Sequence, residues 1–166
     1  VTIKHAYVKY GELISRMKVV DKDGAVVDKE AKVVVQNVEP VIVKVPQSTT
    51  GDEGQELSFS AEAEDFGLLT YTWDFGDGSE VATGTGLTEV KHTYPDDGKY
   101  KLTLSVTDVN DATIARTSDV IINNLPPEIT AAPEDITINE GEAIQGIVKA
   151  IDPAGEVDPV TYVWDF

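Results

Sequence analysis

The stretch that decides the fold runs from Tyr71 to Ser79, Tyr-Thr-Trp-Asp-Phe-Gly-Asp-Gly-Ser. Tyr71, Trp73 and Phe75 alternate with polar residues, so a strand here places three aromatic rings on one face. The Gly-Asp-Gly-Ser end has turn chemistry, because glycine accepts positive φ and aspartate hydrogen-bonds to its own backbone. We therefore predict a core strand that ends in a tight turn.

Working outward from this stretch, the chain repeats itself. His5-Ala6-Tyr7 recurs as His92-Thr93-Tyr94, 87 residues later, and Tyr71 to Phe75 recurs as Tyr162 to Phe166, at an offset of 91. Further pairs at the offset of 87 are Gly11 and Gly98, Val19 and Val106, Asp21 and Asp108, Asn37 and Asn124, Glu53 and Glu140, and Asp65 and Asp152. This self-similarity predicts the back half of one unit (1–38), a complete unit (39–125) and the front half of a third (126–166).

Within the complete unit, most segments have the pattern of strands. Apolar residues alternate with polar ones over Leu57–Ala63 and Tyr100–Val106, which predicts half-buried antiparallel strands. The first and last strands are expected at 41–45 and 120–122, and turns at 51–54, 65–67, 95–98 and 123–127. About seven short strands in one repeat predict an all-β, immunoglobulin-like (Ig-like) β-sandwich.

Three positions refine this prediction. Trp73 follows Phe59 by 14 residues, the place of the core tryptophan in an Ig-type domain. Asp96 to Tyr100 has the form of a tyrosine corner, and Leu102 stands where an antibody domain has its second cysteine. Since the chain has no cysteine, we expect Phe59, Trp73 and Leu102 to form an apolar pin in place of the disulfide.

The motifs W-D-F-G-D-G-S, H-T-Y-x-x-x-G-x-Y-x-L-x-L-x-V-x-D and a closing N-x-x-P together resemble the PKD (polycystic kidney disease) domain. The resemblance covers the whole chain as half, whole and half copies. It implies an extracellular location, on the cell surface or in a secreted protein. It also implies a role as a spacer or as a contact module for proteins or carbohydrates. The first copy departs from the pattern, with Leu13 at the tyrosine-corner position and Ser15 where Leu102 stands.

Composition excludes several classes of partner. The net charge of −17 repels nucleic acid and anionic membranes, and no apolar run approaches the ~20 residues of a membrane span.

His92, Asp74 and Ser79 could suggest a catalytic triad, but each has a structural task at a strand end or turn, so we expect no enzyme activity. Most aromatic residues fall at repeated core positions and leave mainly Tyr10 and Phe66 for stacking on sugars, so a polysaccharide platform is not expected.

Acidic residues gather at the pole where the chain enters the complete unit. In an Ig sandwich, the entry segment and two of the loops meet at this pole. They would bring together six residues with oxygen ligands, Glu39, Glu64, Asp65, Asp108, Asn110 and Asp111. Such an oxygen cage could bind Ca²⁺ as the only cofactor and stiffen the junction between repeats. The alternative is a set of solvated turn carboxylates.

The leading hypothesis is a non-catalytic extracellular spacer, stalk or adhesive module whose partners are neighbouring repeats or copies of itself. Other surface proteins or a polysaccharide are further possible partners. The two half copies are complementary, so the tail of one chain could complete the head of the next and build a fibre. The alternative to this pairing is that the chain is a segment of a longer continuous array of repeats. The alternative function is an accessory domain that positions a secreted protease or glycosidase on a polymeric substrate.

Overall fold

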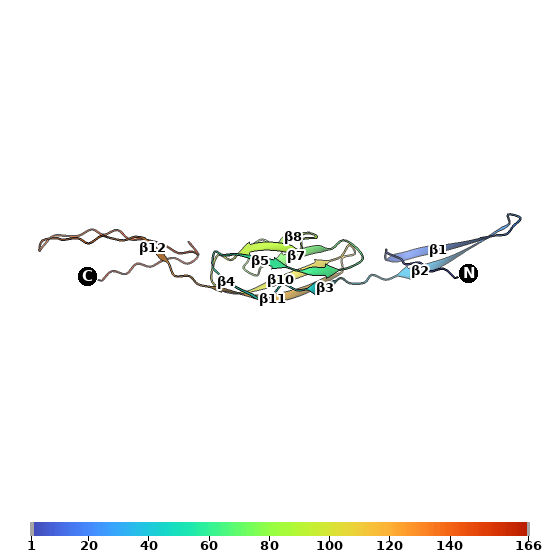
Figure 1. The fold of residues 1–166 in the computed structure, drawn as a ribbon, viewed down its shortest axis with the longest axis horizontal. Helices are drawn as coiled ribbons and strands as arrows, with labels where there is room; N and C mark the ends of the chain where they lie inside the picture. The colour runs from blue at the N-terminus through green and yellow to red at the C-terminus, as the bar shows by residue number, and fades with distance from the viewer. Residues whose placement is uncertain (1, 166) are drawn as a thin grey trace.

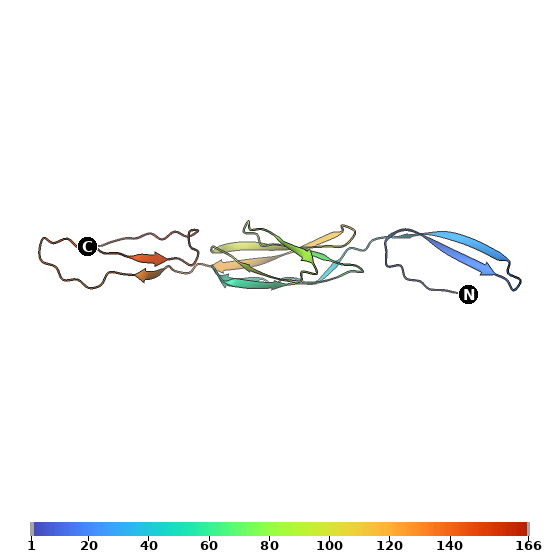
Figure 2. The same ribbon diagram turned by 90° about the horizontal axis from the view of Figure 1, so that it is seen from above.

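A computed structural model describes residues 2–165 and contains thirteen strands and no helix in that range. Three parts lie in a row: an N-terminal hairpin, a central sandwich and an extended C-terminal segment (Figures 1 and 2). The described residues form no helix that is long and apolar enough to cross a membrane.

The central part is a β-sandwich, as predicted. Its larger sheet has the order β4-β11-β10-β7-β8, formed by β4 (Thr49–Asp52), β11 (Thr113–Asn123), β10 (Gly98–Thr107), β7 (Thr70–Asp74) and β8 (Ala82–Thr85). All neighbours are antiparallel except β11 and β4, which are parallel. The facing layer consists of two pairs, β3 (Val41–Lys44) with β6 (Glu62–Glu64), and β5 (Glu56–Ser60) with β9 (Glu89–Thr93).

The core lies between these layers around Trp73, whose side chain is 0% exposed. Its indole N–H donates to the carbonyl oxygen of Leu87 at 2.9 Å, so the one polar atom of the ring is satisfied. Phe59 and Leu102 belong to the same buried cluster. The predicted apolar pin is therefore confirmed, and it links the two layers without a disulfide.

Two tyrosines fix the backbone next to this core. The Tyr100 hydroxyl donates to the carbonyl oxygen of Asp96 at 2.9 Å, which confirms the predicted tyrosine corner. The buried Tyr94 hydroxyl donates to the carbonyl oxygen of Phe75 at 3.1 Å. Burial, and then the charge of Asp77, raises the pKa of Tyr94, so its hydroxyl remains a proton donor.

Three predicted turns are partly wrong at their bounds, since Gly98 belongs to β10, Asn123 belongs to β11, and the turn at 51–54 overlaps β4. Residues 51 and 52 belong to β4, so the turn before β5 is confined to Glu53 and Gly54. Gly51 packs closely against Leu57, because a Cβ there would lie 2.9 Å from Cδ2 of Leu57 and that side chain would have to shift. The predicted strand 57–63 is also interrupted at Ala61, because β5 ends at Ser60 and β6 begins at Glu62.

The flanking parts repeat some strands of the sandwich, whereas the stretches 136–139, 143–147 and 161–165, equivalent to β4, β5 and β7, are not strands. β1 (Gly11–Val20) and β2 (Val26–Val35) lie 87 residues before β10 and β11, and β12 (Glu128–Ala131) and β13 (Lys149–Ile151) lie 87 residues after β3 and β6. Registers recur as well: Gly11 pairs with Val35 as Gly98 does with Ile122. The β12–β13 pair even repeats the register shift of β3 and β6.

Local contacts repeat in the same way. Asp21 Oδ1 accepts the N–H groups of Asp23 and Ala25, as Asp108 Oδ1 accepts those of Asn110 and Ala112. The β1–β2 turn and the β10–β11 turn therefore share one conformation. Domain boundaries at residues 38 and 125 stay a prediction, and the four extra residues of the third copy fall in turns between residues 153 and 158.

Candidate functional site

The pole where the chain enters the sandwich is organised by Asn37. The side-chain N–H group of Asn37 donates to Asp108 Oδ2 at 2.6 Å. The side-chain oxygen of Asn37, Oδ1, accepts from Asn110 Nδ2 at 2.7 Å. These bonds tie the segment after β2 to the β10–β11 loop. Asn37 was not predicted as a site residue, although the Asn-x-x-Pro motif that recurs at Asn124 was a usable signal.

Asp108 is an anchor of this pole. Oδ1 accepts the N–H groups of Asn110 and Ala112 at 2.7 and 2.9 Å, while Oδ2 accepts the Asn37 amide. The Asn37 hydrogen bond foremost, and then the backbone bonds, hold the pKa of Asp108 below its usual range against the opposing effect of burial. Protein donors therefore satisfy both oxygens of an ionised carboxylate.

A groove of about 160 Å³ opens beside these residues. Two of the six predicted calcium ligands, Asp65 and Asn110, line it. Glu39, Glu64 and Asp111 have exposed side chains and do not line the groove. Within residues 2–165, the predicted set does not form a group of three acidic ligand atoms within 4.8 Å of one another. Calcium binding at this pole stays a prediction.

The same groove holds the two aromatic residues that the sequence left outside the core. Tyr10, on the N-terminal hairpin side, is 54% exposed, and Phe66, between β6 and β7, is 82% exposed. Tyr10 precedes the N-terminal hairpin and Phe66 belongs to the central sandwich, so the groove forms where these two parts of the chain meet. Exposed rings of this kind can contact a flat apolar or sugar surface.

Of the residues that suggested a triad, His92 and Ser79 belong to a structural cluster around Asp77, and Asp74 does not. His92 stacks on Phe75, with ring centroids 3.8 Å apart and planes inclined by 5°. Its Nε2 lies 2.6 Å from Oδ2 of Asp77, and Asp77 Oδ1 accepts the Ser79 N–H group. Asp74 instead accepts the Gly76 N–H group. The predicted packing role of His92 is confirmed, but sequence reasoning missed Asp77 as its partner.

Asp77 is held in its ionised form. Burial raises its pKa, but hydrogen bonds from Ser79 and then the bond to His92 and its charge outweigh burial, so the pKa is lowered. The carboxylate thereby ties the tight turn after β7 to β9. This arrangement holds a turn in place, and Ser79 contributes to it through both its side chain and its backbone.

Comparisons with known proteins agree with this geometry. Residues 37–122, more than half of the chain, match the sequence profile of the PKD domain. A microbial collagenase of Vibrio alginolyticus is 33% identical over 97 residues, which cover 57% of this chain and 11% of that protein. Collagenase ColA of Clostridium perfringens is 29% identical over 125 residues, which cover 75% of this chain and 10% of that protein.

Among solved structures, the PKD1 domain of Vibrio anguillarum Epp is 28% identical, with a TM-score of 0.40, over 53% of this chain and 100% of that one. The chain spans about a tenth of the length of the two collagenases that it matches. The profile match covers the sandwich that holds the Trp73 core, the tyrosine corner and the His92 cluster. On this ground, the chain belongs to the PKD domain family.

Proposed function

We propose that this chain is a non-catalytic accessory segment of a secreted hydrolase, where it spaces the enzyme and positions it on a polymeric substrate. The observation that carries the proposal is the path of the chain through the sandwich. Asn37 is bonded at one pole, and the Leu125 N–H group donates to Glu53 at the other. A domain that receives the chain at one pole and releases it at the other extends whatever it links (Figure 1).

The relatives supply the setting. The two relatives described above are named collagenases, and the matching part is about a tenth of each, as expected for an accessory domain beside a catalytic one. This setting favours the hydrolase over a cell-surface stalk, and collagen fibrils become the first polymer to test. Secretion of such an enzyme would place this segment outside the cell.

We assign the polymer contact to the groove at the N-terminal pole, where Tyr10 and Phe66 are exposed. The 166-residue chain would be sedimented with insoluble collagen, chitin and cellulose, and the bound fraction measured. We expect binding to one of these polymers and a loss of at least about tenfold in affinity for a Phe66→Ala, Tyr10→Ala double variant, since buried aromatic anchors dominate such contacts.

Tyr162→Ala is the matched control, because Tyr162 is also an exposed aromatic but lies in the C-terminal segment. Equal binding of all variants would place the contact elsewhere. Absence of binding to every polymer would remove the positioning role and leave the spacer role, which X-ray scattering would test through the elongated shape of the chain.

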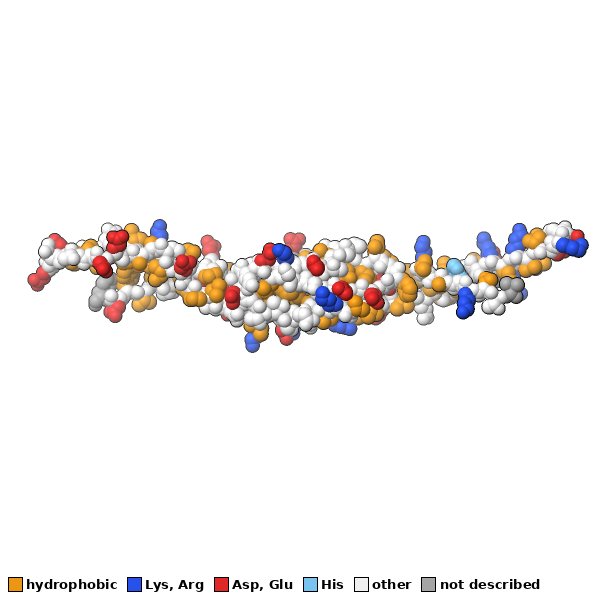
Figure 3. All heavy atoms as spheres, viewed as in Figure 1, with side chains coloured by type: hydrophobic (Ala, Val, Ile, Leu, Met, Phe, Trp, Pro, Cys, Tyr) orange, Lys and Arg blue, Asp and Glu red, His pale blue; other side chains and the backbone are white. Residues whose placement is uncertain are grey.

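A second proposal concerns the neighbours of the sandwich: the N-terminal hairpin pairs with the C-terminal segment of another copy. Residues 1–38 contain seven Lys and Arg against five Asp and Glu, whereas residues 126–166 contain one against nine. Figure 3 shows this separation, with basic side chains along the N-terminal hairpin and acidic ones at the opposite end. Opposite charges at the two ends favour contact between copies.

The registers of the complete copy define this pairing. Leu104 lies opposite Trp73 and Thr103 opposite Asp74, which predicts Met17 opposite Trp164 and Arg16 opposite Asp165. Sedimentation velocity over a range of concentrations tests this: we expect assemblies of two or more chains that dissociate as salt is added. A monomer at all concentrations in low salt would contradict the pairing.

A further inference from the structure

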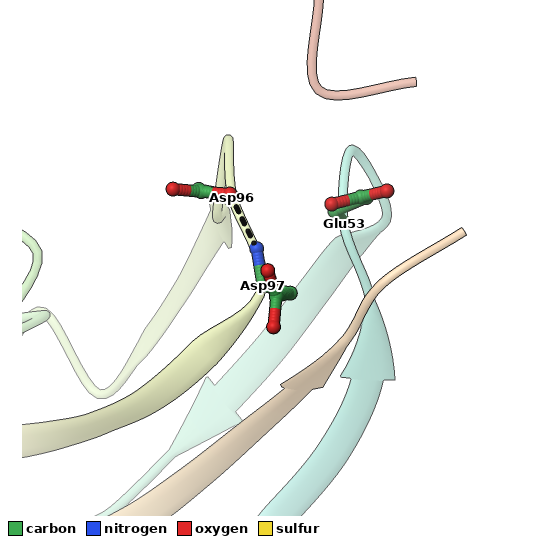
Figure 4. Close-up of side chains that lie close together, drawn as sticks. All are labelled: Glu53, Asp96 and Asp97. Carbon is green, nitrogen blue, oxygen red and sulfur yellow. Dashed lines mark hydrogen bonds between the residues drawn. The ribbon is translucent and has the colours of Figure 1, made fainter. Parts of the chain in front are cut away.

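The pole where the chain leaves the sandwich holds a second acidic cluster, which the sequence did not indicate. Glu53 lies in the turn between β4 and β5, and Asp96 and Asp97 form the turn before β10 (Figure 4). One carboxylate oxygen from each residue lies within 4.8 Å of the other two. The cluster is thus at the far end of β10 from Asp108.

Glu53 makes this cluster unusual, since its side chain is only 2% exposed. Oε1 accepts the Leu125 N–H group at 2.7 Å, but Oε2 is buried and has no hydrogen-bond partner among the described residues. Figure 4 shows one oxygen of Glu53 facing Asp96 and Asp97. A buried carboxylate oxygen without a donor is costly, and two more carboxylates nearby raise the cost.

The backbone holds these three residues in place. Tyr100 donates its hydroxyl to the Asp96 carbonyl oxygen, and the Asp97 N–H group donates to Asp96 Oδ1 at 3.0 Å. Glu53 donates its N–H to the Asn123 carbonyl oxygen at 3.1 Å. The backbone that carries the three carboxylates is therefore held by the tyrosine corner and by the end of β11.

The acidic pair is not required by the turn. In the N-terminal copy, the positions 87 residues before Asp96 and Asp97 are Lys9 and Tyr10, although the turn there also ends in a glycine with positive φ, Gly11. The turn therefore does not explain why Asp96 and Asp97 lie beside the buried Glu53. A bound partner of positive charge would lower the repulsion among these three carboxylates.

We propose that Glu53, Asp96 and Asp97 bind one divalent cation, Ca²⁺ by ligand type. Carboxylate oxygens and carbonyl oxygens are its preferred ligands, and Glu53 Oε2 would gain the partner that it lacks. Asp97 is exposed and Asp96 half-buried, so the ion can enter from solvent and keep water ligands. The net charge of −17 further favours cation binding.

The site lies where the following repeat begins. A Cβ on Gly54, next to Glu53, would lie 3.6 Å from the carbonyl oxygen of Pro153 in the C-terminal segment. The same Glu53 side chain already bonds the backbone of Leu125 in the connecting segment. A cation here would therefore stiffen the C-terminal junction, as Asn37 stiffens the N-terminal one by hydrogen bonds.

The test is calorimetric titration of the chelator-treated 166-residue chain with CaCl₂, together with thermal melting in CaCl₂ and in EDTA. We expect one site with a Kd of about 0.1–1 mM, usual for extracellular modules. At saturating calcium, Tm should rise by about 5 °C or more. Asp97→Asn, at an exposed position that leaves the fold intact, should abolish both effects.

Glu53→Gln keeps the side-chain shape and removes its charge, so it should melt higher than the parent in EDTA and lose its response to calcium. Asp65→Asn and Asp111→Asn, at the opposite pole, are matched controls and should respond as the parent does. No calcium-dependent change in Tm, or loss of the response in the two controls alone, would overturn the assignment.

Discussion

The central sandwich and its flanking parts share some strands, but equivalent residues lie in opposite environments. Val106 in β10 is 0% exposed, whereas its equivalent in β1, Val19, is 58% exposed. Trp73 is buried, while its equivalent Trp164 is 48% exposed. The hairpin register is nonetheless the same in both copies. Register is thus a property of each hairpin and its turn, whereas burial requires the second sheet layer.

The largest expected difference between these regions is at the two tryptophans. Trp73→Ala removes a fully buried ring and a hydrogen bond, and should lower the free energy of unfolding by about 3–5 kcal/mol. Trp164→Ala should cost far less in a monomer. Urea denaturation of both variants measures this, and equal losses would mean that the C-terminal segment has a core of its own.

The Asp77 contacts are present only in the complete copy, because His5 has no counterpart of Asp77 in this chain. Asp77→Asn should lower the free energy of unfolding by about 1.5–3 kcal/mol through loss of a charged hydrogen-bond acceptor. Because the pKa of Asp77 is lowered in the folded state, its contribution is present above the ordinary aspartate range and is lost as pH falls through the folded pKa. Melting curves from pH 7 to pH 2 should show a steeper loss for the parent than for the variant.

Variants of Arg16 test whether the N-terminal hairpin of one copy packs against the C-terminal segment of another. Arg16→Glu should weaken the proposed association about tenfold, since it places like charges opposite one another at Asp165. Adding Asp165→Arg should restore it. Lys29→Glu makes the same charge change on β2, away from the proposed edge, and serves as the control. Sedimentation in low salt measures all three, and equal weakening by Lys29→Glu would show a non-specific charge effect.

Tyr100→Phe examines the tyrosine corner, which the N-terminal copy lacks because Leu13 replaces the tyrosine. The variant loses the bond to the Asp96 carbonyl oxygen and should be less stable by about 1 kcal/mol. Thermal melting in EDTA keeps this effect separate from calcium. A loss above that of Asp77→Asn would show that the corner organises the whole pole.

Asp111→Gly should have the smallest effect. Asp111 has a φ of 67°, and Gly24 occupies the same turn position in the N-terminal hairpin with a φ of 88°. Glycine accepts this conformation more easily, so the variant should gain about 0.5 kcal/mol or remain unchanged. Chemical denaturation measures the change, and destabilisation would reveal a contact of the Asp111 side chain.

Sequence alone determined the repeat, the strand alternation and the core positions, because these depend on period and local turn chemistry. Trp73, Phe59, Leu102 and the corner at Tyr100 were all predictable, since each is tied to a short motif. The parallel pairing of β4 with β11 was not, because residues 49–52 and 120–123 come together only when the sandwich closes.

Tertiary structure alone decided the polar contacts of both poles. Asn37 and Asp108 are 71 residues apart, and Glu53 and Leu125 are 72 apart, so no local pattern reveals which oxygen each donor reaches. The sequence located acidic residues at the N-terminal pole, but the fold used Asp108 to anchor a loop. It left the unpartnered oxygen at Glu53, because burial of a carboxylate depends on how strands from distant segments pack around it.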